Sequence, residues 1–158
     1  MLIDCWWPLF YWNSHPGKPC PSGWTRFKDN CYLVSSSIKT WSQAQAFSRT
    51  LGGGLVKINS PEENEFVLKL VRQKAKSLKQ VWIGLNWDST AFYWYDHSVP
   101  VYTNWAPREP NGRAGEPCAH MYTAQRTLLP FTASGYWNDI SCHIIASWPN
   151  GIVCKRLP

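Results

Sequence analysis

The chain has 158 residues, of which 44% are hydrophobic and 16% charged, so it can form one domain with a buried core and is too apolar for a disordered segment. Its net charge of +6 is compatible with a nucleic-acid partner, but no nucleic-acid motif accompanies the charge. The cations gather instead at the end of a predicted helix, where they favour the helix dipole: Lys69, Arg72, Lys74, Lys76 and Lys79. The sequence therefore predicts no nucleic-acid partner.

The N-terminal stretch "MLIDCWWPLFYW" is apolar, but it has neither a basic start nor a small-residue cleavage site. We therefore expect residues 1–19 to form an N-terminal extension, either truncated or derived from a signal peptide. The rest of the chain has no run of 18 apolar residues, so the sequence predicts no membrane span.

Two helices are predicted in the first half of the chain. In "TWSQAQAFSRTLGGG", Thr40 is the expected N-cap with Gln43 completing a capping box, and the glycines end the helix. The apolar residues of this helix recur on one face: Trp41, Ala44, Phe47 and Leu51. In "SPEENEFVLKLVRQ", Ser60 is the expected cap and Glu63 is expected to close a second capping box. Its predicted buried face comprises Phe66, Val67, Leu70 and Val71.

Short runs typical of β-strands follow the helices: "VWIGL", "AFYWYD", "CAHMYT" and "GIVCK". A long irregular region is expected between about residues 86 and 117, and a loop of that length in a compact domain is usually functional. The sequence thus predicts the α+β class, with helices early and strands late.

The chain has six cysteines and no Cys-x-x-Cys pair. An even count without that spacing favours disulfides over a zinc ribbon or a thioredoxin-like site. Disulfides form in oxidising compartments, so the sequence predicts a secreted or extracellular protein. The histidines at positions 15, 97, 120 and 143 have no metal-ligand spacing, which favours structural or surface roles.

The stretch "REPNGRAGEPCAHM" brings Glu109, Asn111 and Glu116 close together in the sequence. Three such side chains could form a solvated loop, one end of a catalytic carboxylate pair, or part of a calcium site. A glycosidase needs two carboxylates at a set separation, one of them kept protonated by an apolar pocket. Nothing in the sequence isolates one carboxylate in this way, so we do not expect an enzyme.

Seven stretches, in this order, resemble a C-type lectin domain over residues 20–158: "CPSGWTRFKDNCY", "TWSQAQAF", "LVKINSPEEN", "VWIGL", "EPN", "WNDISC" and "GIVCK". The resemblance implies a C-type lectin-like fold, with two helices, a mixed antiparallel sheet and a long calcium-binding loop region. It also implies two disulfides, Cys20 with Cys31 and Cys118 with Cys142.

The same resemblance implies a Ca²⁺ site and gives each of its residues a role in both metal and carbohydrate binding. These residues are Glu109, Asn111, Glu116, Asn138 and Asp139. Calcium takes six to eight oxygens, and these side chains, with the backbone carbonyl of Asp139, would leave room for two vicinal sugar hydroxyls. A Glu-Pro-Asn sequence resembles members that bind equatorial 3- and 4-hydroxyls, as in mannose, N-acetylglucosamine and fucose. The peptide bond before Pro110 is implied to be cis.

Glycans of this mannose type are thus the predicted partners. One calcium and two hydroxyls hold a monosaccharide only weakly, which favours several sites per assembly and makes a homo-oligomer compatible with the prediction. The sequence leaves open a second function class, a C-type-lectin-like module that binds protein or another non-sugar surface. Trp82, Trp94 and Trp105 are expected in the core rather than as platforms for sugar stacking.

Two departures from the family pattern concern the fold. Ser48 stands where the first helix should carry a cysteine, so Cys154 lacks its usual partner, and the pairing of Cys5 and Cys154 stays open. The stretch "TAQRTLLPFTASG" resembles an insertion and is expected to lie beside the binding site.

Overall fold

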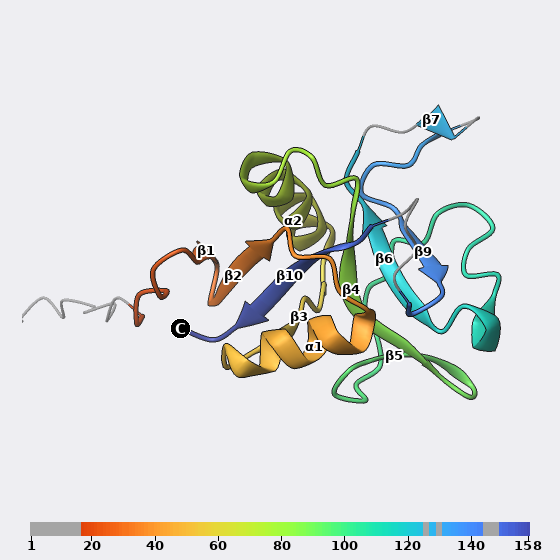
Figure 1. The fold of residues 1–158 in the computed structure, drawn as a ribbon, viewed down its shortest axis with the longest axis horizontal. Coiled ribbons are helices and arrows are strands. Elements are labelled where there is room, and N and C mark those ends of the chain that lie inside the picture. The colour runs from red at the N-terminus through yellow and green to blue at the C-terminus, as the bar shows by residue number, and fades with distance from the viewer. Residues whose placement is uncertain (1–16, 125–126, 129–130, 144–148) are drawn as a thin grey trace, which may run out of the picture.

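The computed structural model describes residues 17–124, 127–128, 131–143 and 149–158 (Figure 1). Its elements, in chain order, are β1 (Thr25–Phe27), β2 (Asn30–Ser35), α1 (Trp41–Thr50), β3 (Gly54–Leu55), α2 (Pro61–Lys74), β4 (Gln80–Asp88), β5 (Ala91–Trp94), the 3₁₀ helix η1 (Arg113–Gly115), β6 (Cys118–Tyr122), β7 (Thr127–Leu128), β8 (Phe131–Thr132), β9 (Trp137–Ile140) and β10 (Gly151–Arg156). Two α-helices and many strands confirm the α+β class. Over these residues, no helix has both the length and the apolar character needed to cross a bilayer.

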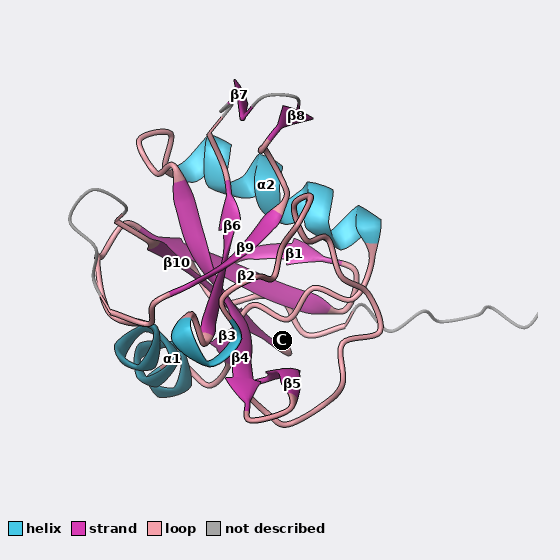
Figure 2. Cartoon of the chain, turned by 90° about the vertical axis from the view of Figure 1, so that its right-hand side faces the viewer, coloured by secondary structure: helices cyan, strands magenta, loops and turns pink. Residues whose placement is uncertain are grey.

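One sheet holds most of the strands, in the order β1-β2-β10-β4-β6-β9, with β3 added to β10 and β5 added to β4. Strands β10 and β4 are parallel, while the other paired strands of this sheet are antiparallel, so the sheet is mixed as predicted. Figure 2 shows α1 and α2 on opposite sides of it.

The prediction of helices early and strands late is wrong in one respect, because the β1–β2 hairpin precedes both helices. The predicted irregular region also begins too early. Strand β4 continues to Asp88 and turns back into β5, which ends at Trp94, so this hairpin occupies positions 86–94. In the remaining irregular chain, the segment around η1 lies at the opposite end of the molecule from the C-terminus (Figure 1).

The first helix begins as predicted. Thr40 accepts a hydrogen bond from the backbone N–H of Gln43, and the Gln43 side chain accepts one from the N–H of Thr40. The buried face differs from the prediction, since Ala44, Gln45 and Ser48 are its buried residues. The Oε1 of Gln45 accepts the backbone N–H of Leu55 on β3 at 2.8 Å, while its Nε2 is buried without a hydrogen-bond partner among the described residues. The predicted apolar residues Trp41, Phe47 and Leu51 are half-buried and pack around Ala44.

The second helix is capped by Ser60, whose side chain accepts the N–H of Glu63 at 3.1 Å. The expected capping box is wrong, however, because the Glu63 side chain does not accept the N–H of Ser60 in return. Glu63 accepts hydrogen bonds from the N–H of Asn59 at 2.9 Å, the hydroxyl of Tyr32 at 2.6 Å and the ammonium of Lys155 at 2.5 Å. Glu63 is therefore a buried anion with several partners, which compensates for its loss of water. Three predicted apolar positions are buried as expected, Val67, Leu70 and Val71, and Phe66 packs against them.

The two helices pack against different faces of the sheet because successive strand residues point to opposite sides. On β10, Val153 joins the core against α2, while Ile152 and Cys154 join the core against α1. Trp82 and Trp94 are buried as predicted, and the half-buried Trp105 packs against the larger core. The indole N–H of Trp82 donates to the carbonyl of Lys39, which ties the start of α1 to the sheet.

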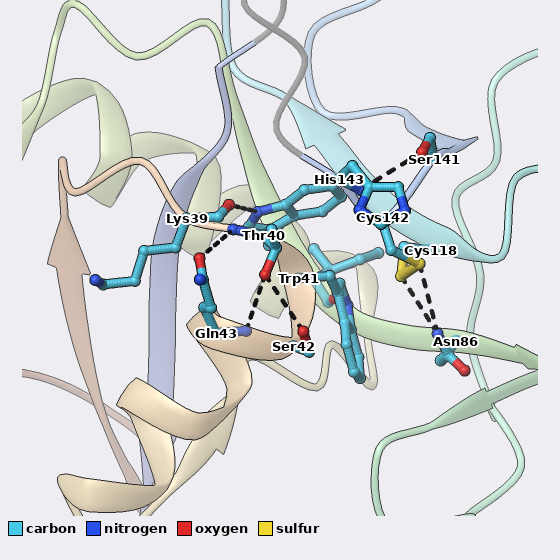
Figure 3. The surroundings of a disulfide bond; sticks show 12 residues. Lys39, Thr40, Trp41, Ser42, Gln43, Asn86, Cys118, Ser141, Cys142 and His143 are labelled. Carbon is cyan, nitrogen blue, oxygen red and sulfur yellow. Dashed lines mark hydrogen bonds between the residues drawn. A yellow bond between two sulfur atoms is a disulfide. The ribbon is translucent and has the colours of Figure 1, made fainter.

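Both disulfides implied by the family resemblance are present, Cys20–Cys31 and Cys118–Cys142. Figure 3 shows the second one beside the first turn of α1, with the side-chain amide of Asn86 directed at its sulfurs. The backbone N–H of Trp41 donates to the carbonyl of Cys142 at 2.9 Å. This disulfide therefore joins the start of β6 and the end of the β9 segment to the helix.

Among the described residues, Cys154 is buried and has no disulfide partner, and its Sγ contacts the hydroxyl of Ser48 on α1. Ser48 thus occupies the place where the family resemblance implies a cysteine. Burial raises the pKa of the Cys154 thiol to about 11, so this thiol stays protonated and unreactive at neutral pH. Cys5 lies outside the described residues.

The Ser48–Cys154 contact predicts that Ser48→Cys forms a third disulfide. We expect a gain on the order of 2–4 kcal/mol in the free energy of unfolding, because the bond would close a long loop in the unfolded chain. Peptide mapping should detect a linked pair from positions 48 and 154, and thermal unfolding should measure the gain. The Ser48→Ala variant is the matched control, and an unlinked thiol at position 154 in the Ser48→Cys protein would contradict the prediction.

Candidate functional site

The loop with Glu109 and Asn111 is anchored to β9 at two points. At the first, the N–H of Ala106 donates to the carbonyl of Trp137, and the N–H of Trp137 donates to the carbonyl of Asn104, both at 2.8 Å. At the second, the carboxylate of Asp139 accepts the N–H groups of Asn111, Gly112 and Arg113 at 3.1, 2.7 and 3.2 Å. The segment between these anchors holds the cis peptide bond from Glu109 to Pro110, as predicted.

Asp139 is wholly buried, with 0% of its surface exposed. A buried carboxylate without partners would cost several kcal/mol, and three charge-assisted hydrogen bonds from one loop offset that cost. The same bonds fix the position of residues 111–113. Asp139 therefore holds the loop against the sheet.

Glu109 and Glu116 lie close enough to Asp139 for the carboxylates to repel one another. Burial, then the neighbouring carboxylate of Asp139 and the charge of Glu116, raise the pKa of Glu109 to about 7. Burial and the charge of Asp139 also raise the pKa of Glu116. Gly112 makes room for this arrangement, since a Cβ there would lie 2.5 Å from the Glu116 side chain. The structure thus brings together the three acidic residues predicted for the site.

The two predicted asparagines differ in their contacts. Asn111 is exposed, and its backbone N–H is held by Asp139. Asn138 is half-buried, and its side-chain Nδ2 donates to the backbone carbonyl of Asp139 at 2.7 Å. The same Nδ2 lies 3.3 Å from Nε2 of His120. All five predicted residues therefore lie in or directly beside one cluster.

The chemistry of these residues fits a hard divalent cation. The Oε2 atom of Glu109 is buried without a hydrogen-bond partner, and among the described residues no lysine, arginine or histidine forms an ion pair with Glu109, Glu116 or Asp139. Crowded carboxylates without a counter-charge are stabilised by a cation. In the part of the chain that is described, however, no three acid, histidine or cysteine side chains are arranged as metal ligands, and the Asp139 carboxylate accepts the loop N–H groups instead.

An apolar hollow of about 330 Å³ lies beside this cluster. Its wall includes Trp87, Phe92, Trp105 and Pro110, the last of which stands between Glu109 and Asn111. Trp105 was expected to be a core residue. It lines the hollow and also packs against the core rings of Phe92 and Trp137.

The predicted insertion does not emerge beside the acidic cluster. Residues 123–135 connect the Met121–Trp137 end of the β6–β9 hairpin, whereas the loop of residues 109–116 joins the other end, where Cys118 pairs with Ile140. Strands β7 and β8 pair with each other within this insertion, and Figure 1 shows β7 far from η1. The reason is that β6 and β9 pair antiparallel, so the insertion leaves the hairpin at one end and the loop of residues 109–116 enters it at the other. Residues 125–126 and 129–130 lie outside the described part.

A structural or surface role was predicted for His120, but neither His120 nor Asn150 was predicted to lie beside the cluster. His120 is wholly buried on β6, and its Nδ1 lies 2.9 Å from Oδ1 of Asn150. Burial lowers the pKa of His120 to about 4, so the ring is neutral at physiological pH. The sequence offers only one hint of this role, a histidine inside the apolar strand "CAHMY".

Residues 37–156 match the family model described as Lectin C-type domain. The chain belongs to the C-type lectin family. The perlucin-like protein of Mytilus galloprovincialis is 34% identical over 143 residues, which cover 85% of this chain and 86% of that protein. The low affinity immunoglobulin epsilon Fc receptor of Homo sapiens is 37% identical over 142 residues, which cover 87% of this chain and 38% of the receptor. The chain thus spans most of the first relative and little more than a third of the second.

Solved structures confirm the C-type lectin fold. The cow carbohydrate-recognition domain of CD23, determined in the presence of a GlcNAc2Man3 oligosaccharide, superposes with a TM-score of 0.71 at 36% identity and covers 89% of this chain and 97% of that one. A calcium-independent type II antifreeze protein superposes with a TM-score of 0.74 at 26% identity and covers 90% and 98% of the two chains. Family members of this fold therefore include one with calcium-independent function.

The Asp139 anchor predicts local loosening when its acceptor is removed. In Asp139→Ala, the N–H groups of residues 111–113 lose their partner, so the loop should open while the sheet stays folded. Hydrogen exchange measured without added metal should show faster exchange in residues 109–116 and unchanged exchange in β4. The control is Asn111→Ala, which removes only an exposed side chain; equal protection of the loop in both variants would count against the anchor.

Proposed function

We propose that this protein is a calcium-dependent carbohydrate-binding lectin that recognises mannose-type sugars. The observation that carries the proposal is the crowding of Glu109, Glu116 and Asp139 around a loop that contains Glu-Pro-Asn, with no paired cation among the described residues. The family membership supports it, as does the similar CD23 domain determined in the presence of a mannose-containing oligosaccharide.

The proposed calcium ligands are the side chains of the five clustered residues and the backbone carbonyl of Asp139. When bound, calcium supplies a positive centre that can accept two sugar hydroxyls as further ligands. The side chains of Glu109 and Asn111 then act as an acceptor and a donor toward those hydroxyls. A pair of equatorial 3- and 4-hydroxyls, as in mannose, N-acetylglucosamine or fucose, matches the order of acid and amide in this loop.

Two further parts of the proposal concern location and assembly. The disulfides Cys20–Cys31 and Cys118–Cys142 support an extracellular location, because such bonds persist in oxidising compartments. A single shallow sugar site binds weakly, so we propose that useful avidity comes from several copies of the domain presented together. Binding of sugars, without chemistry on them, is the whole of the proposed activity.

Retention on immobilised mannan tests the proposal. We expect the protein to bind in calcium and to elute with a chelator. The double variant Glu109→Gln with Asn111→Asp keeps the net charge of the loop but reverses which position accepts and which donates a hydrogen bond. Its affinity for mannose should fall roughly ten- to hundredfold, as unmade bonds to charged groups cost on the order of 1–3 kcal/mol, and galactose should compete better.

Calcium occupancy, measured separately by calorimetry, is the control for the double variant. If that variant bound calcium and kept its preference for mannose, Glu109 and Asn111 would not be the residues that read the sugar. If the unmodified protein were retained equally with and without the chelator, or bound no glycan on an array, the chain would instead belong among lectin-like modules that bind other surfaces.

The raised pKa of Glu109 predicts that calcium binding weakens in acid. In the metal-free protein Glu109 carries a proton below about pH 7, and calcium must displace that proton before the carboxylate can bind it. Affinity should therefore fall as pH decreases, by roughly 10- to 100-fold between pH 7.5 and pH 5. Calorimetry at both pH values measures this change, and circular dichroism confirms that the fold persists.

The Glu109→Gln variant is the matched control for pH, because it lacks the group with the most strongly raised pKa. It should bind calcium more weakly at pH 7.5 and lose less affinity on acidification. An identical dissociation constant of the unmodified protein at the two pH values would argue against a carboxylate cage.

A further inference from the structure

A chain of hydrogen bonds runs from the core to the proposed calcium site. His120 on β6 pairs directly across from Asn138 on β9, so their side chains share one face of the sheet. The Nε2 of His120 lies 3.3 Å from Nδ2 of Asn138, and its Nδ1 lies 2.9 Å from Oδ1 of Asn150, the residue directly before β10. The Asn138 Nδ2 also donates to the carbonyl of Asp139 at 2.7 Å.

The backbone carbonyl of Asp139 determines which atom donates and which accepts in each hydrogen bond of this network. A carbonyl oxygen only accepts, so the Asn138 atom beside it must be the amide nitrogen; with the amide turned over, two oxygens would face each other. The same nitrogen faces His120, so Nε2 must accept and can carry no proton. The ring proton therefore lies on Nδ1, which donates to Asn150. The whole network has one consistent set of orientations.

We propose that His120 is a positioning residue that holds the Asn138 amide in the orientation required by a cation. With both N–H bonds of Asn138 directed at protein acceptors, its Oδ1 is the atom left to bind an outside ligand. A turned amide would instead present an NH₂ group, which cannot bind a cation. The link to calcium rests on the proposed function, whereas the orientation of Asn138 and the tautomer of His120 do not.

The alternative role for His120 is purely structural, that of a buried histidine satisfied by its neighbours. Both roles predict a loss of stability when the ring is replaced. Only the positioning role predicts that the effect on metal binding depends on whether residue 138 has an amide that can turn. This difference allows the two roles to be separated.

The first test uses the unmodified protein without calcium. Long-range ¹H–¹⁵N NMR spectra of ¹⁵N-labelled protein distinguish a protonated from an unprotonated ring nitrogen. We expect His120 to be neutral, with its proton on Nδ1 and an unprotonated Nε2. A proton on Nε2 would require Asn138 to present its oxygen to the ring, and that result would overturn the proposal.

The second test is a double-mutant cycle of calcium affinity. His120→Phe should lower the affinity about tenfold, a typical loss for a residue that orients a metal ligand. In the Asn138→Asp background, the same change should alter affinity by less than about twofold, since a carboxylate presents oxygen in either orientation. Equal losses in both backgrounds would make His120 merely structural.

If the proposed calcium-dependent function is wrong, the two tests give results that differ from those expected if only the role of His120 is wrong. The unmodified protein would then bind no calcium, while the NMR spectra would still report the tautomer of His120 and so decide the orientation of Asn138. Thermal unfolding of each variant separates a folding defect from an effect on the site, and the NMR test needs no variant if His120→Phe fails to fold.

Discussion

The proposed calcium-binding end of this domain depends on one buried charge. Asp139 lies on β9, the strand at one edge of the sheet, with no exposed surface, and its carboxylate is tolerable there only because three successive backbone N–H groups bind it. Those N–H groups belong to residues 111–113, so the requirement to satisfy the charge also fixes the loop. The acidic cluster follows from this, because Glu109 and Glu116 flank the segment that Asp139 holds. Strand β9 thus fixes the position of the irregular loop of residues 109–116.

The sheet can position the loop because its hairpin is itself braced. The Cys118–Cys142 disulfide joins the start of β6 to the chain after β9, and the backbone of Trp41 binds the carbonyl of Cys142. Trp137 is wholly buried and accepts and donates backbone hydrogen bonds to the loop at Ala106 and Asn104. The loop is therefore tied to β9 at positions 137 and 139, on either side of Asn138. Such supports allow exposed binding residues to keep their geometry on an irregular segment.

Local features were predictable from the sequence, and non-local ones were not. The N-caps Thr40 and Ser60 depend on residues within one turn, and both were located correctly. Strands β1, β2, β3 and β9 were missed; β1, β3 and β9 have only two to four residues, which is too few to show a periodicity. The partners of Glu63 were also missed, as Tyr32 and Lys155 reach it only through the folded sheet. The acidic cluster was predicted from resemblance to a family, since residues 109 and 139 are brought together by strand pairing that the sequence alone does not reveal.

The same carboxylates have opposite consequences for the metal-free fold and for the proposed complex. The pKa of Glu109 is higher in the folded protein than in an unfolded chain, so its contribution to stability is fully present below about pH 4.5 and is lost as pH rises through about 7. Its ionised form repels Asp139 and Glu116, which cannot move apart because the loop is anchored at both ends. A bound cation would reverse this preference, because it stabilises the ionised form. The rigid anchoring that makes the metal-free site electrostatically unfavourable near neutral pH would therefore, in the proposed complex, hold the carboxylates in place for a cation.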